Sequence, residues 1–348
     1  MQRKKIIVGV LFFIILVFHL KAENFVRVDQ WKHEGVVGYV FCSFINAENQ
    51  VVASFYKSPN FIIQRDKLIE FAPYGQGPND LMDTKAGFNY NGDVAFIELA
   101  DKIKIFTKKE DGTYAWKETK WLKRGQYAHM VRDGIYFDHK WFLAGEELLD
   151  YKNNIAGVSY VKVFDDNGKP LKQLIHEEYK QPNQFHLMRF YLVPYKDDRV
   201  FFLPENELKV SVISAKKLEV SKEVELEIPS FYKKMPDTFY VFKKYNNAQE
   251  NFTLDLENWA MGYSRITKVV MNGDSLVVQL RTCRADMKKF ALLFYSAETF
   301  KLERTVFIDD FLLGARADKF YFFANGNPGR DEDTEEIVIN VYAFEKKK

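Results

Sequence analysis

The chain has 348 residues, with 50 lysines and arginines against 48 aspartates and glutamates, and 16% of its residues are aromatic. A charge this close to zero argues against a nucleic-acid binder, because such proteins neutralise phosphates with an excess of basic side chains. Two cysteines, Cys42 and Cys283, exclude a disulfide scaffold and a cysteine-based zinc cluster. We expect them to be separate core or strand residues, although an oxidising compartment would permit a bridge between them.

Residues 1–22 have the pattern of a secretory signal peptide. Three basic residues stand among the first five, an apolar run covers 6–20, and Ala22 supplies the small residue of a cleavage site. The run is shorter than the roughly 20 residues that a membrane-spanning helix needs, and no cysteine follows it to carry a lipid. We predict cleavage near Ala22 and export to the periplasm or the cell exterior. Because the leader holds four basic residues and no acidic ones, the formal charge of +2 becomes −2 after cleavage.

Short runs in which apolar and polar residues alternate dominate the rest of the chain, and this alternation is typical of β-strands. The clearest hairpin has strands at 158–164 and 171–175 around the turn pair Asn167-Gly168. The same order of short strands recurs at 92–97, 102–106 and 114–116, at 199–203, 208–213 and 218–228, and at 274–280, 290–295 and 302–308.

These strands group into six units of similar length. The units cover about 31–80, 81–128, 129–180, 181–230, 255–310 and 311–345. One four-stranded sheet cannot bury both of its faces, whereas six sheets packed around an axis bury one another's faces. The pattern therefore predicts an all-β fold, a six-bladed β-propeller of four-stranded antiparallel blades, in one domain over 23–348. We expect a helical or loop insertion near 231–257, and ring closure by pairing of 25–28 with 337–344.

Residues 70–81 read Glu-Phe-Ala-Pro-Tyr-Gly-Gln-Gly-Pro-Asn-Asp-Leu and contain a loop of Gly75, Gly77, Pro78, Asn79 and Asp80. The two glycines permit positive φ and Pro78 fixes the following turn. We predict a connector between blades. The alternative is an anion site made of backbone amides, but the loop lacks the Lys-Ser/Thr of a P-loop.

This loop resembles the G-x-G-P-G-E-F signature of six-bladed, TolB-like or NHL-like propellers exported by Bacteroidetes. Asn79 stands where that signature has Gly, and Asp80 and Leu81 stand where it has Glu and Phe. The resemblance implies the propeller fold and export. Some six-bladed relatives are metal-dependent lactonases or lyases, but their Glu, Asn and Asp ligands cannot be placed on this sequence.

Two arginines align between repeats. Arg189 precedes Val200 by eleven residues and Arg265 precedes Leu276 by eleven, with Asp198 matching Asp274. Looser counterparts are Arg132 and Arg316. If these residues begin innermost strands, their side chains meet at one mouth of the channel, where planar guanidinium groups suit an anionic ligand. The alternative is that each arginine pairs with a carboxylate of the next blade.

Histidines offer a weaker candidate site. His129 and His186 both precede apolar strands, so they also belong to the candidate channel residues. No H-x-x-x-H, H-E-x-x-H or G-x-S-x-G motif occurs, and we predict no catalytic residue, metal or cofactor. Aromatic residues beside loops suggest a platform for a sugar or a peptide. These residues are Tyr74, Tyr127, Phe185, Trp259 and Tyr263.

Three hypotheses for the function follow from these patterns. The leading hypothesis is an exported, non-catalytic binding or scaffold propeller, with a small anionic ligand, a glycan, a peptide or an envelope protein at the channel mouth. The first alternative is a metal-dependent hydrolase or lyase of the six-bladed superfamily. The second is a structural partner in an envelope assembly, which would use the face of a blade.

Overall fold

A computed structural model describes residues 24–98, 102–122, 129–150, 155–178, 189–196, 198–236, 259–324, 326 and 334–345. In this part of the chain 24 strands form six four-stranded antiparallel sheets, which confirms the predicted six-bladed β-propeller. With the innermost strand first, the sheets are β2 (Val40–Ile45), β3 (Val51–Phe55), β4 (Asn60–Ile63) and β5 (Leu68–Ala72) in blade 1; β6 (Ala86–Tyr90), β7 (Asp93–Ile97), β8 (Lys102–Lys108) and β9 (Tyr114–Trp121) in blade 2; β10 (His129–Phe137), β11 (Lys140–Asp150), β12 (Ile155–Asp165) and β13 (Pro170–Glu178) in blade 3; β14 (Phe190–Tyr195), β15 (Arg199–Pro204), β16 (Lys209–Ser214) and β17 (Glu219–Glu225) in blade 4; β18 (Ile266–Asn272), β19 (Ser275–Arg281), β20 (Phe290–Ser296) and β21 (Leu302–Ile308) in blade 5; and β22 (Phe311–Arg316), β23 (Lys319–Phe323), β24 (Thr334–Phe344) and β1 (Phe25–Val37) in blade 6.

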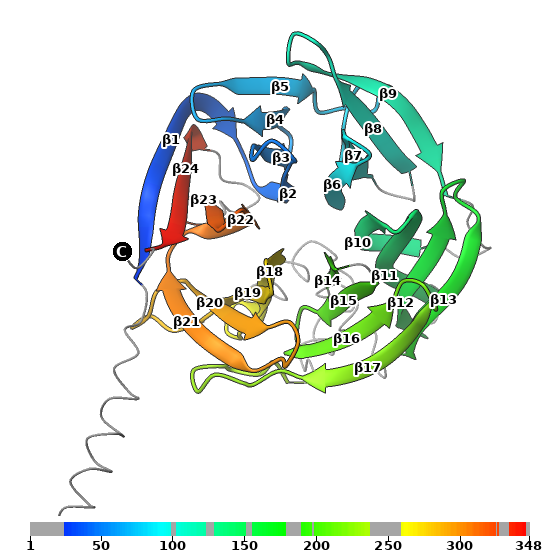
Figure 1. Cartoon of the computed structure of the whole chain (residues 1–348), viewed down its shortest axis with the longest axis vertical. Helices are drawn as coiled ribbons and strands as arrows, with labels where there is room; N and C mark the ends of the chain where they lie inside the picture. The colour runs from blue at the N-terminus through cyan, green and yellow to red at the C-terminus, as the bar shows by residue number, and fades with distance from the viewer. Residues whose placement is uncertain are drawn as a thin grey trace, which may run out of the picture.

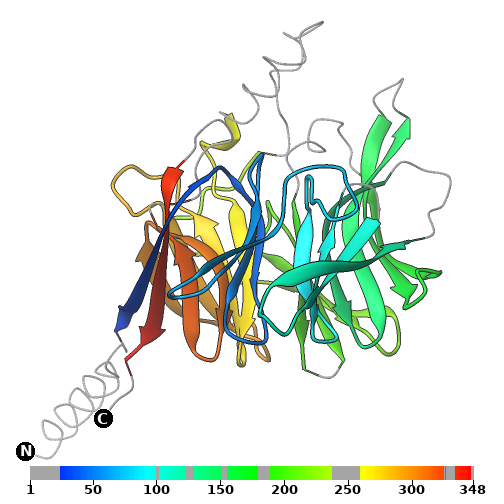
Figure 2. The same ribbon diagram turned by 90° about the horizontal axis from the view of Figure 1, so that it is seen from above.

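The blades stand side by side around a central axis, and the innermost strand of each contacts the innermost strands of its two neighbours (Figure 1). Each blade has four antiparallel strands, an even number, so the chain leaves a blade at the end where it entered. All six innermost strands therefore begin at one mouth of the channel, which we call the connector mouth. The opposite mouth carries the turns after the first and third strands of each blade, and we call it the hairpin mouth (Figure 2).

The N-terminal strand closes the ring. β1 pairs antiparallel with β24, with Phe25 opposite Phe344 and His33 opposite Ile337, as the sequence predicts. The strand is longer than expected, because it continues to Val37. Residues 31–37 therefore belong to blade 6 and not to the first unit, where the repeat count had placed them. β1 is the outermost strand of blade 6, so the two ends of the described chain are tied together in one sheet (Figure 1).

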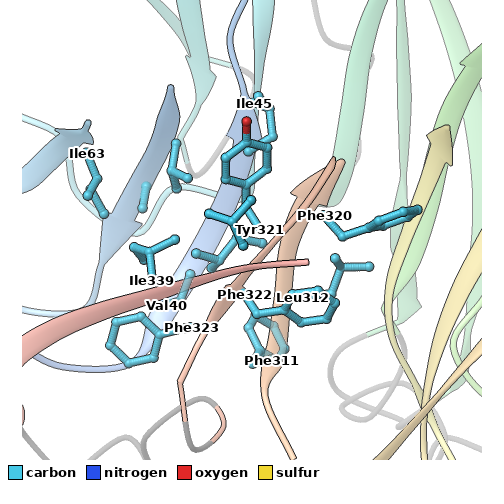
Figure 3. Close-up of a cluster of buried hydrophobic side chains, with 14 of the residues drawn as sticks. Val40, Ile45, Ile63, Phe311, Leu312, Phe320, Tyr321, Phe322, Phe323 and Ile339 are labelled. Atoms are coloured by element: carbon cyan, nitrogen blue, oxygen red, sulfur yellow. The ribbon is translucent and has the colours of Figure 1, made fainter. Parts of the chain in front are cut away.

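The core lies between the blades. Every residue of β3 and β7 is buried, because both faces of these middle strands pack against neighbouring sheets. The outermost strand β17 has no buried residue. In one cluster with Val40 and Ile45 (Figure 3), Phe323 of blade 6 packs against Phe55 of blade 1, and Phe311 and Phe320 pack against Phe290 and Phe294 of blade 5. Burial of such side chains contributes about 1.5–3 kcal/mol each, so inter-blade packing supplies most of what holds the ring together.

Two further expectations concern residues that the structure does not describe. The predicted signal peptide, 1–22, lies outside the described residues. So does most of the predicted insertion, while its described part, 231–236, is not helical. The predicted Asn167-Gly168 turn joins β12 to β13, and Gly168 has a φ of 73°. Among the described residues no helix is long and apolar enough to cross a membrane.

Candidate functional site

Three buried glutamates occupy corresponding places at the connector mouth of blades 2, 3 and 4. Glu98 and Glu205 directly follow the second strand of their blades, and Glu146 lies in the corresponding stretch of β11. Glu98 accepts a hydrogen bond from the backbone N–H of Met82 at 2.9 Å, as Glu205 does from the N–H of Arg189 at 3.0 Å. The three side chains are between 0 and 5% exposed. Charges buried this deeply require partners.

Each glutamate has a basic partner. Arg132 contacts Glu146 at 3.0 Å, Lys102 contacts Glu98 at 2.7 Å, and Arg265 of blade 5 contacts Glu205 of blade 4 at 2.5 Å. Burial raises the pKa of Glu146 to about 8, although Arg132 acts in the opposite direction. The candidate residues predicted from the sequence do not include these glutamates. The signal that could have found it is a glutamate at the end of the second predicted strand in three consecutive repeats.

The structure places Arg189 and Arg265 at matching positions, each directly before an innermost strand. The carbonyl of Arg189 accepts a hydrogen bond from the N–H of Glu205, and that of Arg265 accepts one from the N–H of Arg281, both at 2.9 Å. The two positions differ in their surroundings. The guanidinium of Arg265 meets a carboxylate, whereas that of Arg189 crosses the channel.

Arg189 belongs to blade 4 and its guanidinium donates a hydrogen bond to the hydroxyl of Tyr39 in blade 1. In a ring of six, blades 1 and 4 are opposite each other, so this bond spans the channel. The guanidinium carbon also lies 5.6 Å from the centre of the Tyr39 ring. Such a cation–π contact contributes about 0.5–2 kcal/mol. The guanidinium of Arg189 is therefore held in the channel by the hydroxyl and the ring of Tyr39, and not by a carboxylate.

A second cation reaches across the ring. The ammonium of Lys268 in blade 5 donates to the carbonyl of Ser43 in blade 1 at 2.6 Å, past the innermost strand of blade 6. Burial lowers the pKa of Lys268, and the charge of Asp133 acts against that shift. Asp133, in blade 3, accepts hydrogen bonds from the N–H of Leu192 at 2.7 Å and of Gly134 at 2.9 Å. Burial nevertheless raises the pKa of Asp133 to about 7.

The sequence did not single out Lys268, Asp133 or Tyr39. Lys268 and Asp133 directly follow bulges in β18 and β10, and a bulge shifts the inward and outward alternation by one residue. An uninterrupted alternation of inward and outward side chains therefore assigns Lys268 and Asp133 to the wrong face of the strand. Tyr39 is the residue of blade 1 that corresponds to Arg189. The carbonyl of Tyr39 accepts a hydrogen bond from the N–H of Tyr56, just as the carbonyl of Arg189 accepts one from the N–H of Glu205.

The other predicted site residues lie elsewhere or outside the described chain. Arg316 is the exposed last residue of β22, so it lies at the hairpin mouth and does not join the other arginines. The backbone of His129 begins β10, opposite Glu147. His186 lies outside the described residues, as do Tyr127 and Phe185. Of the remaining aromatic residues, Trp259 and Tyr263 pack against each other with ring centres 5.0 Å apart, and Tyr74 is half-buried.

Both cysteines are free thiols. Cys42 lies on the innermost strand of blade 1 and its sulfur contacts the hydroxyl of Thr84 at 3.6 Å. Burial raises the pKa of the Cys42 thiol to about 11. A thiol with such a pKa is protonated at neutral pH and is a poor nucleophile. Cys42 therefore belongs to the core cluster between blades 1 and 2, as expected for a separate core residue.

The glycine loop forms the connector between blades 1 and 2. The carboxylate of Asp80 accepts a hydrogen bond from the N–H of Gly77 at 2.8 Å, and the carbonyl of Leu81 accepts one from the N–H of Gly75 at 3.3 Å. These amides are engaged within the loop itself. One expectation is wrong, because neither glycine nor Asn79 has a positive φ. A Cβ at position 75 or 77 would lie within 2.8 Å of the Asp80 carboxylate, so a larger residue at either position would require the Asp80 side chain to move.

Lys104 of β8 holds the loop in place. This lysine is fully buried and is not among the candidate residues predicted from the sequence. Its ammonium donates to the carbonyls of Gly77, at 2.7 Å, and Asp80, and it lies 3.5 Å from the Glu98 carboxylate. Burial lowers the pKa of Lys104, and Glu98 acts in the opposite direction. One lysine thus satisfies two carbonyl groups of the connector.

Replacing Lys104 with methionine should therefore destabilise the protein by about 2–4 kcal/mol, because two carbonyls and part of a carboxylate lose their donor. Urea unfolding followed by tryptophan fluorescence measures this loss. Lys102→Met is the matched control. Lys102 also contacts Glu98, but its side chain is 23% exposed and contacts no loop carbonyl, so its loss should cost less. Equal stability of the two variants would contradict the role given to Lys104.

The comparisons with known proteins agree with the fold. No protein-family model matches the sequence, and the search of curated proteins finds no relative. Solved structures do match. A member of the DUF4221 family from Bacteroides vulgatus superposes with a TM-score of 0.58 at 11% identity, over 93% of this chain and 99% of the other. A protein of Bacteroides fragilis described as exported gives 0.56 at 14% identity, over 94% and 95% of the two chains.

An enzyme is also among the solved structures. The aldose sugar dehydrogenase of Streptomyces coelicolor, solved with bound PQQ, gives a TM-score of 0.51 at 10% identity over 93% of this chain and 99% of the other. The likeness to all three proteins is one of fold. Among the described residues of this chain, no group of three or more His, Cys, Asp or Glu side chains is arranged to hold a metal ion.

Proposed function

We propose that this protein is an exported, non-catalytic binding propeller that holds an anionic ligand at the connector mouth of its channel. Arg189 and Lys268 are the residues that would contact the ligand. The observation that carries the proposal is the bond from the Arg189 guanidinium across the channel to the Tyr39 hydroxyl, a neutral group. Exported propellers of Bacteroides share the fold, which fits the signal-peptide pattern of residues 1–22.

The balance of charge at the mouth supports an anion. The guanidinium groups of Arg132 and Arg265 are already engaged by the carboxyl groups of Glu146 and Glu205. Arg189 and Lys268 donate to a hydroxyl and a carbonyl. The acid that acts on Lys268 is Asp133, which has a pKa of about 7, and the acid that acts on Arg189 is Glu205, which is bound by Arg265. A unit anion about 4 Å from one such cation gains about 4 kcal/mol at an effective dielectric constant near 20. An anion is therefore the ligand that this mouth favours most.

The chemistry of the mouth favours binding over catalysis. A nucleophile or general base needs a reactive protonation state and a free lone pair. Cys42 is held as a thiol by its raised pKa, and both oxygens of Asp133 accept backbone hydrogen bonds. Glu205 is bound by Arg265 and by a backbone amide. The side chains best placed to act as a nucleophile or a general base are therefore either protonated or already engaged in structural contacts.

Calorimetric titration of the dialysed protein with phosphate, citrate and galacturonate tests the proposal. We expect binding of at least one anion, at least tenfold weaker in Arg189→Met and in Lys268→Met. Lys217→Met is the control, because Lys217 lies in the turn between β16 and β17 at the hairpin mouth. Failure of all three anions to bind would refute the anion site, and turnover of a lactone, ester or glycan panel would refute the non-catalytic function.

A further inference from the structure

Tyr39 brings a hydroxyl group to the connector mouth. The residue stands directly before β2 of blade 1, and its side chain is half-buried. Its oxygen accepts a hydrogen bond from the guanidinium of Arg189. A phenol that accepts through its oxygen still has one O–H proton to donate. Within the part of the chain that the structure describes, Arg189 is the hydrogen-bond partner of this hydroxyl, so no protein acceptor takes its proton.

Tyr191 shows how a tyrosine in a structural role differs. Arg189 lies 5.6 Å from the centre of the Tyr39 ring, and its charge also acts on Tyr191. The hydroxyl of Tyr191 donates to the carbonyl of Ile266 at 2.9 Å and thereby joins blade 4 to blade 5. The hydroxyl of Tyr39 is instead an acceptor toward Arg189. Its proton is left for a group that enters the mouth from outside.

Glu205 is the carboxylate whose charge acts on Arg189, and it is held away from the guanidinium by other bonds. Its Oε2 atom accepts from the backbone N–H of Arg189 at 3.0 Å and contacts the guanidinium of Arg265 at 2.5 Å. A guanidinium has five N–H groups, and in the described chain Arg189 uses one of them, for Tyr39. The pair of Arg189 and Tyr39 therefore offers N–H and O–H donors even though Glu205 weakens the positive field around it.

These donors lie side by side at the channel axis. Arg189 comes from blade 4 and Tyr39 from the opposite blade 1, and the bond between them brings the remaining N–H groups next to the O–H proton. A carboxylate or a phosphate group has neighbouring oxygens, so it can accept one hydrogen bond from each donor. A hydroxyl that accepts from a cation is also a stronger donor, because hydrogen bonds in a chain polarise one another.

We propose that Tyr39 is a third ligand-binding residue and that the acidic group of the ligand is an oxyanion, with one oxygen bound by the Arg189 guanidinium and another by the Tyr39 hydroxyl. This inference rests on the proposed function, because it concerns the same anion site. It adds a binding residue from the opposite blade and the class of the anion. A one-atom anion such as bromide cannot accept in this paired way and binds more weakly.

Calorimetric titration with phosphate, galacturonate and bromide at pH 6, where each is essentially a monoanion, tests the pair. Phenylalanine at position 39 keeps the ring beside Arg189 and removes only the hydroxyl. We expect Tyr39→Phe to bind the tighter of the two oxyanions about tenfold more weakly than the wild type, which itself binds bromide at least tenfold more weakly. Tyr56→Phe is the matched control, because Tyr56 is a half-buried tyrosine of the same blade, and its affinities should be unchanged. Thermal unfolding verifies that each variant is folded.

A second measurement separates a donor from a residue that only positions Arg189. 3-Fluorotyrosine at position 39 has a more acidic hydroxyl than tyrosine, so it is a stronger donor and a weaker acceptor. At pH 6 it is still protonated. A donor role predicts that the fluorinated protein binds the same oxyanion about twofold more tightly than the wild type. A role as acceptor for Arg189 alone predicts equal or weaker binding.

The outcomes separate this inference from the proposed function. If Tyr39→Phe binds the oxyanion as tightly as the wild type, or fluorination does not strengthen binding, Tyr39 is not a donor and the inference fails while the anion site at Arg189 stands. If Tyr39→Phe binds more tightly, Tyr39 competes with the ligand and the inference fails again. Bromide that binds as tightly as the oxyanions would refute the class of anion. If Tyr39→Phe does not fold, the fluorinated protein decides. If no anion binds at all, the inference and the proposed function both fail.

Discussion

Replacing Glu205 with glutamine should destabilise the protein by about 3–5 kcal/mol, because it removes the carboxylate that the buried Arg265 guanidinium contacts. The two side chains are 5% and 15% exposed and meet at 2.5 Å. Glutamine keeps the size of the side chain and an oxygen that can still accept the hydrogen bond from the Arg189 N–H. The loss of stability therefore measures the effect of removing the negative charge of Glu205. Chemical unfolding of the purified variant measures it.

A double-mutant cycle and an exposed control complete this test. Arg265→Met in the Glu205→Gln background should recover part of the lost stability, because the buried guanidinium that has lost its contact with the Glu205 carboxylate is then removed. Glu298→Gln is the matched control. Glu298 also binds an arginine, Arg199, at 2.8 Å, but it is 48% exposed, so its replacement should have a much smaller effect. If the two glutamine variants lose the same stability, the buried pair does not hold blades 4 and 5 together as we describe.

The second large effect is a dependence of stability on pH that originates at Glu146. Burial raises the pKa of this carboxyl to about 8 in the folded protein, from an ordinary value of 4.5. The folded state therefore holds the proton more tightly than the unfolded state. The contribution of Glu146 to stability is fully present below about pH 4.5 and is lost as the pH rises to about 8. At about 1.4 kcal/mol per pKa unit, this loss is on the order of 5 kcal/mol.

Glu146→Gln should remove this dependence. Within the described part of the chain the Oε1 atom of Glu146 has no hydrogen-bond partner, and Arg132 binds Oε2, so a glutamine can keep the contact with its oxygen. We expect the difference in unfolding free energy between variant and wild type to grow between pH 5 and pH 8, in favour of the variant. Asp133 also titrates in this range, but it is present in both proteins and cancels in the difference. Parallel stability curves would contradict the assignment to Glu146.

The sequence by itself determined the fold. Strand periodicity, the turn at Asn167-Gly168 and the six repeated units were sufficient for a six-bladed propeller, because these signals are local and every blade repeats them. The pairing of β1 with β24 was also predictable, since an otherwise incomplete last blade needs a fourth strand. The match between Arg189 and Arg265 followed from the spacing of residues within equivalent hairpins.

Only the tertiary structure decided what those positions do. Arg189 and Arg265 have the same place in the repeat, but one donates to Tyr39 of the opposite blade and the other binds Glu205 of the adjacent blade. The role of a repeated position depends on its neighbours in other blades, and the spacing within one repeat does not contain that information. The glycines at 75 and 77 illustrate the same limit, because they make room for a carboxylate and do not turn the chain. Local pattern specified the strands, and contacts between distant strands specified the site.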